Sequence, residues 1–378
     1  MLFLINMQES EIIIIGGGLA GLTAGVHLSK NGFDVTVIEK NTYPKHKVCG
    51  EYISNEVLNY FNFLGIDIKS LNPTKIDTLE FSDCNGKVIK SKLPLGGFGV
   101  SRYILDHYLY QKAVDNNCKF IFDSVESVGY QNEVFTVETT KNLILKSQIV
   151  LGAFGKRSNI DLFLNRKFIE KKSDWLGIKS HYKGVFKNNF VGLHNFEGGY
   201  CGVSKVENKI INICYLVNYN AFKKYKNTVD FESSVLCKNP NLKEIFENTT
   251  MVFDKPLAIS QISFSEKNPI ENHLLMIGDT AGLIHPLCGN GMAMAIHSAK
   301  IASELVSDFK NNKISNRRTL EFEYTKRWNK NFRKRLQMGR YLGKLLQQPR
   351  LTNIFLKIFV KMPFLLPIII KRTHGKPF

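Results

Sequence analysis

Three glycines and one acid near the start of the sequence have the types and spacing of a dinucleotide-binding turn. Gly16-Gly17-Gly18-Leu19-Ala20-Gly21 fits the pattern G-x-G-x-x-G, and Glu39 follows 23 residues after Gly16. In such a turn the first glycine permits the tight bend, the second lets a pyrophosphate approach the backbone, and the third lets helix and strand pack closely. Free N–H groups at the helix start would bind the phosphates. An acid at position 39 would bind a ribose hydroxyl pair, which favours FAD or NAD over NADP.

The elements that must position this turn are visible in the same stretch. Residues 11–15 form a β-branched run, which is typical of a strand buried on both faces of a parallel sheet. Residues 19–30 are predicted to be helical, with Gly32 ending the helix, and residues 34–38 are predicted to be the second strand. The order of these elements, a strand, a glycine turn, a helix and a second strand that ends in an acid, predicts a Rossmann-type unit. The alternative is a glycine-rich loop that only packs a helix against a strand.

A second segment, far along the chain, also has small residues of the kind that let a ligand come close to the backbone. Gly278-Asp279-Thr280-Ala281-Gly282 follows the apolar run 274–277, and Gly289-Asn290-Gly291-Met292 follows Pro286 at the start of a helix rich in small residues. Two distant half-sites favour FAD, held tightly as a prosthetic group.

Three shorter segments complete the pattern. They are Lys47-Val48-Cys49-Gly50-Glu51, residues 101–106 (SRYILD) and residues 152–158 (GAFGKRS). These segments are similar to K-x-C-G-E, S-R-x-x-L/F-D and G-A-D-G-x-x-S. With the two glycine motifs, they make residues 10–310 resemble the p-hydroxybenzoate hydroxylase superfamily of flavoproteins, in particular its geranylgeranyl reductase and flavin-dependent halogenase branches.

The resemblance implies roles for individual residues. Asp279 would accept a hydrogen bond from the ribityl chain of FAD, and the backbone of residues 289–292 would meet the pyrimidine end of the flavin. Arg102 would contact the ribityl or phosphate region, although a helix also allows it to pair with Asp106 four residues later. The expected FAD-binding residues are Gly16, Gly18, Leu19, Ala20, Gly21, Glu39, Lys40, Cys49, Arg102, Val125, Gly155, Gly278, Asp279, Pro286, Gly289, Asn290, Gly291 and Met292. Phe154 replaces the family's Asp, and the electron donor, NAD(P)H or a reduced carrier, stays open.

Cys49 and Glu51 are the candidate catalytic residues, because the family's loop passes close to the flavin. The alternatives are an inert, buried thiol for Cys49 and the start of a helix for Glu51. The seven cysteines include no C-x-x-C pair and no Cys/His cluster. This pattern predicts no metal site and indicates a reducing, cytoplasmic compartment.

The predicted fold class is a composite α/β architecture. A Rossmann-type FAD-binding domain (residues 8–75, 101–160 and 271–310) is interleaved with an antiparallel substrate domain (residues 76–100 and 161–270). A basic helical region follows at residues 311–378. Within the substrate domain, residues 200–206 and 210–217 flank a short turn and predict a hairpin.

The function that the resemblance implies is FAD-dependent reduction of C=C bonds in an isoprenoid, polyene or other lipid-like substrate, by hydride transfer from flavin N5. Tyr200, Cys201 and Tyr215 are candidates for the lining of the substrate pocket. A monooxygenase of the same fold, hydroxylating or epoxidising its substrate, is the main alternative. A non-catalytic, flavin-binding membrane adaptor is a third. The W-x-W-x-I-P motif of tryptophan halogenases is absent, which counts against halogenation.

The positive charge is concentrated at one end of the sequence. Residues 311–378 carry a net charge of +15 out of +18 for the whole chain. The apolar stretch 351–370 is interrupted by two lysines and two prolines, so it does not suit a membrane span. It suits an amphipathic element on an anionic bilayer, which would place the protein on the inner face of the membrane. Packing of this region on the substrate domain is the alternative. No basic-aromatic pattern points to nucleic acid, and the sequence does not indicate the oligomeric state.

Overall fold

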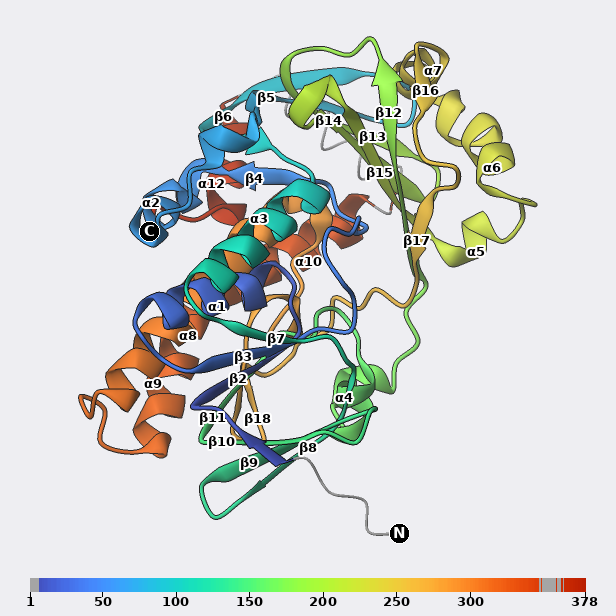
Figure 1. The fold of residues 1–378 in the computed structure, drawn as a ribbon. Helices are drawn as coiled ribbons and strands as arrows, with labels where there is room; N and C mark the ends of the chain where they lie inside the picture. Colours follow the sequence, from blue (N-terminus) through green and yellow to red (C-terminus); the bar gives the residue numbers. More distant parts are fainter. Residues whose placement is uncertain (1–6, 347, 349–357, 359–361, 363) are drawn as a thin grey trace.

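The computed structural model describes residues 7–346, 348, 358, 362 and 364–378, and the strands in these residues form three sheets (Figure 1). The strands are β1 (Met7–Glu9), β2 (Ile12–Ile15), β3 (Val35–Ile38), β4 (Tyr52–Ser54), β5 (Thr74–Ser82), β6 (Val88–Gly99), β7 (Lys119–Ile121), β8 (Val125–Gln131), β9 (Val134–Thr139), β10 (Ile144–Ser147), β11 (Ile149–Gly152), β12 (Trp175–Gly184), β13 (Asn189–Phe196), β14 (Gly199–Lys205), β15 (Ile211–Asn218), β16 (Thr249–Met251), β17 (Leu257–Ile259), β18 (Ile270–Glu271) and β19 (Leu274–Met276). The α-helices are α1 (Leu19–Lys30), α2 (Leu58–Leu64), α3 (Arg102–Asp115), α4 (Asn159–Phe163), α5 (Tyr219–Phe222), α6 (Thr228–Ser234), α7 (Pro240–Glu247), α8 (Gly291–Lys310), α9 (Arg317–Trp328), α10 (Lys334–Leu346) and α12 (Leu365–Thr373).

The first sheet is the predicted Rossmann-type unit. Its strand order is β18-β19-β11-β2-β3-β7, and all neighbours are parallel except β18 and β19. All four residues of β2 are buried, as their β-branched run predicts, because the sheet is covered on both faces. Helix α1 joins β2 to β3 and packs against α3 and α8. The predicted strand, turn, helix and strand are all confirmed.

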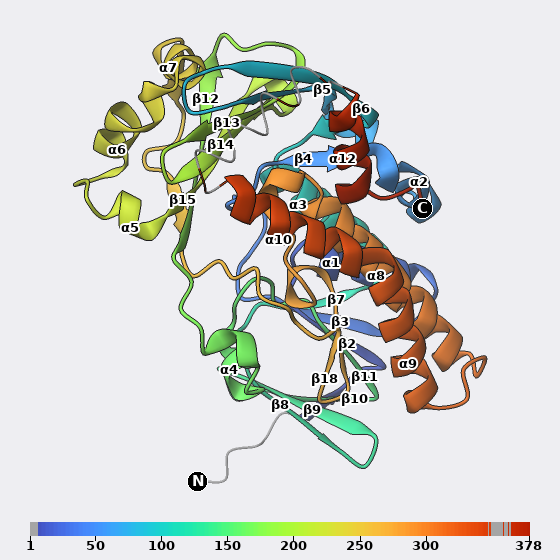
Figure 2. The same cartoon turned by 180° about the vertical axis from the view of Figure 1, so that it is seen from behind.

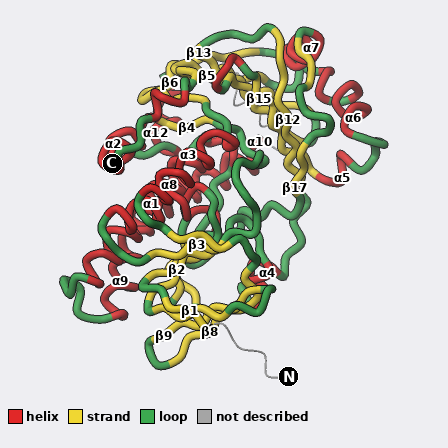
Figure 3. Tube along the Cα trace, viewed as in Figure 1, coloured by secondary structure: helices red, strands yellow, loops and turns green. Residues whose placement is uncertain are grey.

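The second sheet has nine strands and lies at the other end of the molecule, with α1, α3 and α8 between the two (Figures 1 and 3). Its order is β16-β12-β15-β14-β13-β5-β6-β4, with β17 also paired to β12. The predicted hairpin is confirmed as β14 and β15, which are antiparallel, with Tyr200 opposite Leu216. Strand β4 pairs with β6 in the second sheet. The segment 39–51, which joins β3 to β4, therefore crosses from the first sheet to the second.

The third sheet is a small one at the far edge of the Rossmann-type unit. It consists of β8, β9 and β10, with β1 added in parallel to β10. The composite α/β fold class predicted from the sequence is therefore confirmed. The boundaries of the domains stay a prediction.

The basic C-terminal region is mostly helical where it is described. Helices α8, α9 and α10 follow one another, with a π-helical turn (Asn329–Arg333) before α10, and α12 packs against β6 and α10 (Figure 2). No helix in the described residues is long and apolar enough to cross a bilayer. Most of the stretch 351–370, predicted to be amphipathic, lies outside the described residues, and only its last part belongs to α12.

Candidate active site

One cavity of about 1100 Å³ lies between the Rossmann-type sheet and the nine-stranded sheet. It has two parts with different chemistry. We call the part lined by the glycine turns and the charged side chains the cradle. We call the part lined by Leu79, Phe81, Leu93, Leu193, Leu366 and Ile370, from β5, β6, β13 and α12, the apolar arm.

The cradle brings together segments that are up to 276 residues apart in the sequence, from Gly16 to Met292. All the predicted FAD-binding residues except Gly21 and Val125 line the cavity. Gly21 lies behind the turn, where a Cβ atom would come within 1.9 Å of the Gly16 carbonyl oxygen. Val125 lies on β8 in the small sheet, packed against the main core. The roles of the lining residues toward FAD stay predictions.

The first glycine turn is shaped for a pyrophosphate. Gly16 has a φ of +105°, which an L side chain rarely adopts. A Cβ atom on Gly18 would meet only the Nζ atom of Lys47, at 4.0 Å, so the backbone there faces open space in the cavity. Glu39 is held close to the turn, because its Oε2 atom accepts a hydrogen bond from Gly17 N at 2.8 Å. The turn, its open face and the adjacent carboxylate fit the ADP half of FAD.

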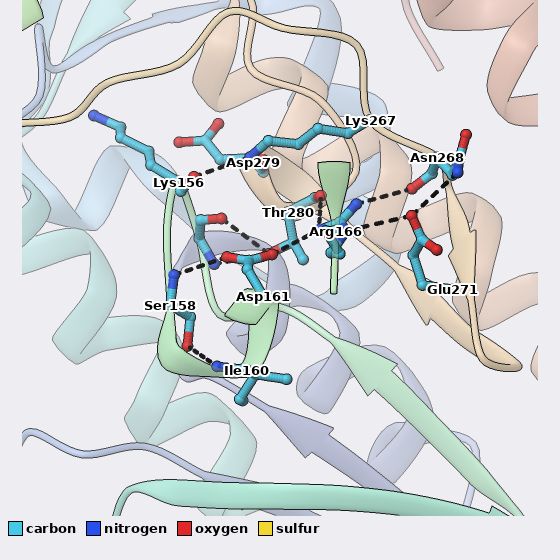
Figure 4. A network of polar contacts seen from close by, with 11 residues as sticks. Lys156, Ser158, Ile160, Asp161, Arg166, Lys267, Asn268, Glu271, Asp279 and Thr280 are labelled. Atoms are coloured by element: carbon cyan, nitrogen blue, oxygen red, sulfur yellow. Dashed lines mark hydrogen bonds and ion pairs between the residues drawn. The ribbon is translucent and has the colours of Figure 1, made fainter. Parts of the chain in front are cut away.

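The second glycine segment is held by a buried arginine that the sequence did not reveal. Arg166, whose side chain is 1% exposed, donates to Asp161 Oδ1 at 2.9 Å and to the Thr280 carbonyl at 3.0 Å (Figure 4). Lys267 donates to the carbonyls of Asp279 and Lys156, both at 2.9 Å. Burial lowers the pKa of Lys267 to about 8. These bonds fix the segment 278–280 against the segment 156–161.

Arg102 forms an ion pair and lines the cradle at the same time. Its Nε and Nη2 atoms donate to the two carboxylate oxygens of Asp106, at 2.6 and 2.7 Å. Lys47 Nζ lies 3.7 Å from the same carboxylate. The two alternatives for Arg102 are therefore compatible, because a bidentate pair with Asp106 fixes the guanidinium at the cavity wall. Its contact with FAD stays a prediction.

The two candidate catalytic residues differ in what they offer to the cavity. Cys49 is half-buried and lines the cavity. The Glu51 side chain is 0% exposed, and both of its oxygens are engaged. Its partners Lys179 and His181 lie on β12, some 130 residues away, and no local signal in the sequence indicated them. Glu51 also lines the cavity, but its carboxylate oxygens are already engaged by Lys179, His181 and the Arg102 backbone N–H, and its catalytic role stays a prediction.

The substrate side contains some of the predicted residues. Tyr200 and Tyr215 line the cavity, and the Tyr215 hydroxyl donates to Glu232 at 2.9 Å. Cys201 is buried in the core between the nine-stranded sheet and α6. His46 and His374, which the sequence did not single out, also line the cavity. His297 is a packing residue, with its ring stacked on Phe378 at 4.0 Å between centroids.

Comparisons with known proteins agree with this geometry. The family model of NAD(P)-binding Rossmann-like domains matches residues 14–45, and that of squalene epoxidase matches residues 238–338. A digeranylgeranylglycerophospholipid reductase of Methanococcus aeolicus is 24% identical, over 90% of this chain and 87% of its own length. The structure of the flavin-dependent brominase Bmp2 superimposes with a TM-score of 0.80 at 17% identity, covering 98% of this chain and 94% of that one.

A halogenase that was solved with FAD is also similar. The complex of PltM with phloroglucinol and FAD has a TM-score of 0.74 at 17% identity, covering 93% of this chain and 80% of that one. The fold, the cradle and these relatives agree on the cofactor, which is FAD. This chain is an enzyme, an FAD-dependent oxidoreductase, and it is similar over most of its length to digeranylgeranylglycerophospholipid reductases and to flavin-dependent halogenases.

Proposed function

We propose that the enzyme reduces C=C bonds in an isoprenoid or similar lipid-like substrate. The observation that carries this proposal is the apolar arm, which is continuous with the cradle in one cavity. Its walls from β5, β6 and α12 belong to one cluster of buried apolar residues. Each buried CH₂ group of a ligand contributes about 0.8 kcal/mol, so a long hydrocarbon chain would bind there without polar contacts.

FAD, when bound and reduced, supplies the hydride for such a reaction. The residues of this chain bind and orient the reactants and exclude water. The cradle would hold the cofactor through Gly18, Glu39 and Asp279, and the arm would align the hydrocarbon chain with it. The similarity to a digeranylgeranylglycerophospholipid reductase supports a polyprenyl substrate. The electron donor of the proposed reaction is NAD(P)H or a reduced carrier.

The proposal can be tested by product analysis and by narrowing the arm. Under anaerobic conditions, the dithionite-reduced holoenzyme should convert a geranylgeranylated glycerophospholipid into products heavier by two hydrogens per reduced bond. Ile370→Trp should lower this rate by about tenfold or more, because overpacking a filled arm costs 1–3 kcal/mol, while FAD content stays unchanged. Val229→Trp is the control, since Val229 lies on α6, is 68% exposed and is not among the residues that line the cavity. No mass change with any polyprenyl lipid would contradict the proposal.

A second function is favoured by one specific observation. The squalene epoxidase model matches residues 238–338, which include the second glycine segment. A monooxygenase would take up oxygen and give a product heavier by one oxygen atom. The same product analysis, run in air with NAD(P)H, therefore separates the two functions. If neither NAD(P)H nor dithionite reduced the bound flavin, the third alternative, a non-catalytic flavin-binding membrane adaptor, would be favoured.

We also propose that the enzyme docks on an anionic lipid surface beside the arm. Tyr341 on α10 and Phe364 and Ile368 near and on α12 are 70%, 59% and 45% exposed. Lys371 and Arg372, three and four residues after Ile368 on α12, are also exposed. Apolar side chains among cations suit the interface of an anionic bilayer.

Sedimentation with phosphatidylglycerol vesicles tests this docking. The double variant Phe364→Ser/Ile368→Ser should bind at least about a hundredfold more weakly, since each buried apolar side chain contributes roughly 1.5–3 kcal/mol. Binding should also fall as salt is raised. Phe322→Ser on α9, where Phe322 is 63% exposed, is the control and should bind as the wild type does. Equal binding of all three proteins would contradict docking through α12.

A further inference from the structure

We propose that Glu51, Lys179 and His181 form a buried anchor that holds the Cys49 loop and the start of α3 in place against the FAD cradle. Glu51 is then a positioning residue rather than a catalytic one. The anchor joins three parts of the chain: the loop 47–51, strand β12 and helix α3. The inference concerns the cofactor site and does not depend on which substrate is reduced.

Three unfavourable features meet at Glu51. Its φ is +54°, in the left-handed region where a residue with a Cβ atom is strained. Its carboxylate is completely buried, and so is the ammonium group of its partner Lys179. Burying two charges costs more than burying two apolar side chains of the same size. A strained residue persists only where the surrounding contacts hold it in that conformation, and such residues cluster at functional sites.

The hydrogen bonds show what the carboxylate does. Oε1 accepts from Lys179 Nζ at 2.5 Å and from Arg102 N at 2.8 Å, and Oε2 lies 2.7 Å from His181 Nε2. Arg102 is the first residue of α3, so one oxygen ties the loop to both the helix and the nine-stranded sheet. Because the Arg102 side chain lines the cradle, the anchor fixes a second wall of the FAD site.

Cys49 is held by the same loop. Its Sγ atom accepts a hydrogen bond from Glu51 N at 3.5 Å, and its carbonyl accepts one from Asn212 Nδ2 at 3.2 Å. The Glu51 carbonyl in turn accepts from Val100 N at 3.2 Å. The thiol is therefore presented to the cavity by a loop whose fixed points are Glu51 and β15.

The charges of the cluster are matched. Burial alone would raise the pKa of Glu51, but the adjacent Lys179 ammonium and His181 outweigh burial and lower it. Glu51 therefore stays ionised and paired. His46 extends the cluster toward the cavity, with its ring 5.1 Å from that of His181. Removing either Glu51 or Lys179 leaves the other charge buried without its partner. An unpaired buried charge strongly destabilises the structure around it.

The test measures how well Cys49 is held, independently of turnover. The FAD-loaded wild type, Glu51→Gln and Lys179→Met are treated with N-ethylmaleimide, and labelling of each cysteine is followed by peptide mass spectrometry. Both variants should label Cys49 about tenfold faster or more, because local opening becomes easier when the anchor is broken. Both should also release FAD faster, as measured by flavin fluorescence. Cys84, in the turn that follows β5, is the internal reference and should label at an unchanged rate.

Two further variants keep the test decisive. Glu80→Gln removes another buried carboxylate of the same sheet, one paired with Lys90 and Lys187, and should leave Cys49 labelling unchanged. The double variant Glu51→Gln/Lys179→Met leaves no unpaired charge, so it should fold even where a single variant does not. Cys49 labelling within twofold of the wild type in the folded double variant would overturn the proposal. Loss of turnover with unchanged labelling and unchanged FAD release would instead make Glu51 catalytic.

Discussion

Gly18→Val is expected to give a folded protein that purifies without flavin. A Cβ atom at this position meets no protein atom closer than 4.0 Å, so the added side chain starts in open space. The same side chain points into the part of the cavity where the pyrophosphate must approach the backbone. We expect FAD affinity to fall by at least about a hundredfold, which corresponds to roughly 3 kcal/mol. Flavin absorbance after purification and reconstitution measures the loss, and circular dichroism checks the fold.

Two other glycines serve as controls for this substitution. Gly21→Val puts a Cβ atom within 1.9 Å of the Gly16 carbonyl oxygen, so it should destabilise even the FAD-free protein. Gly129→Val on β8 has no atom within 4 Å of the new Cβ atom and lies away from the cavity, so both flavin content and stability should be kept. A yellow Gly18→Val protein with normal FAD affinity would refute the position assigned to the pyrophosphate.

Arg166→Met is expected to have the largest effect on stability. It removes the guanidinium that pairs with Asp161 and leaves this carboxylate buried without its ionic partner. Breaking a buried ion pair on one side typically costs about 3–5 kcal/mol of unfolding free energy. The variant also frees the Thr280 carbonyl and Asn268, so the second glycine segment should lose its fixed position. Urea unfolding of the FAD-free protein measures the first effect, and FAD titration measures the second.

The matched control for the stability measurement is Arg157→Met, nine residues earlier in the chain. Arg157 is exposed and makes a single hydrogen bond of 3.4 Å, to the Ile169 carbonyl. A change of stability within about 0.5 kcal/mol is expected there, as for most surface substitutions. If Arg166→Met bound FAD as tightly as the wild type in spite of its lower stability, Arg166 would support the fold but not the cofactor site.

The parts of the fold that could be predicted from the sequence are those written in local patterns. Three such elements are the buried strand β2, the helix α1 and the hairpin of β14 and β15. Each is specified by residues that lie close together in the sequence. The cradle could be predicted because the glycines of both segments are needed for tight turns and for close approach of a ligand to the backbone.

The interactions that could not be predicted depend on residues far apart in the chain. Arg166 contacts Thr280 across 114 positions, and Glu51 contacts Lys179 across 128. A lone Arg in a loop or a lone Lys in a strand is ordinarily a surface residue, so neither one stands out by its type. Packing of the C-terminal region on the substrate domain was one alternative that the sequence left open, and α12 does pack against β6. The wall that α12 adds to the arm was not predicted, because the position of a basic helix on a sheet depends on the whole tertiary structure.

The position of α12 in the chain has a consequence for the order of events during synthesis on the ribosome. Every predicted contact of the cradle lies at or before Met292, whereas the wall of the arm formed by Leu366 and Ile370 emerges more than 70 residues later. Domains generally fold as units while the chain grows. A nascent chain that has left the ribosome as far as Met292 therefore already contains every predicted FAD-binding residue, but it still lacks this wall of the arm.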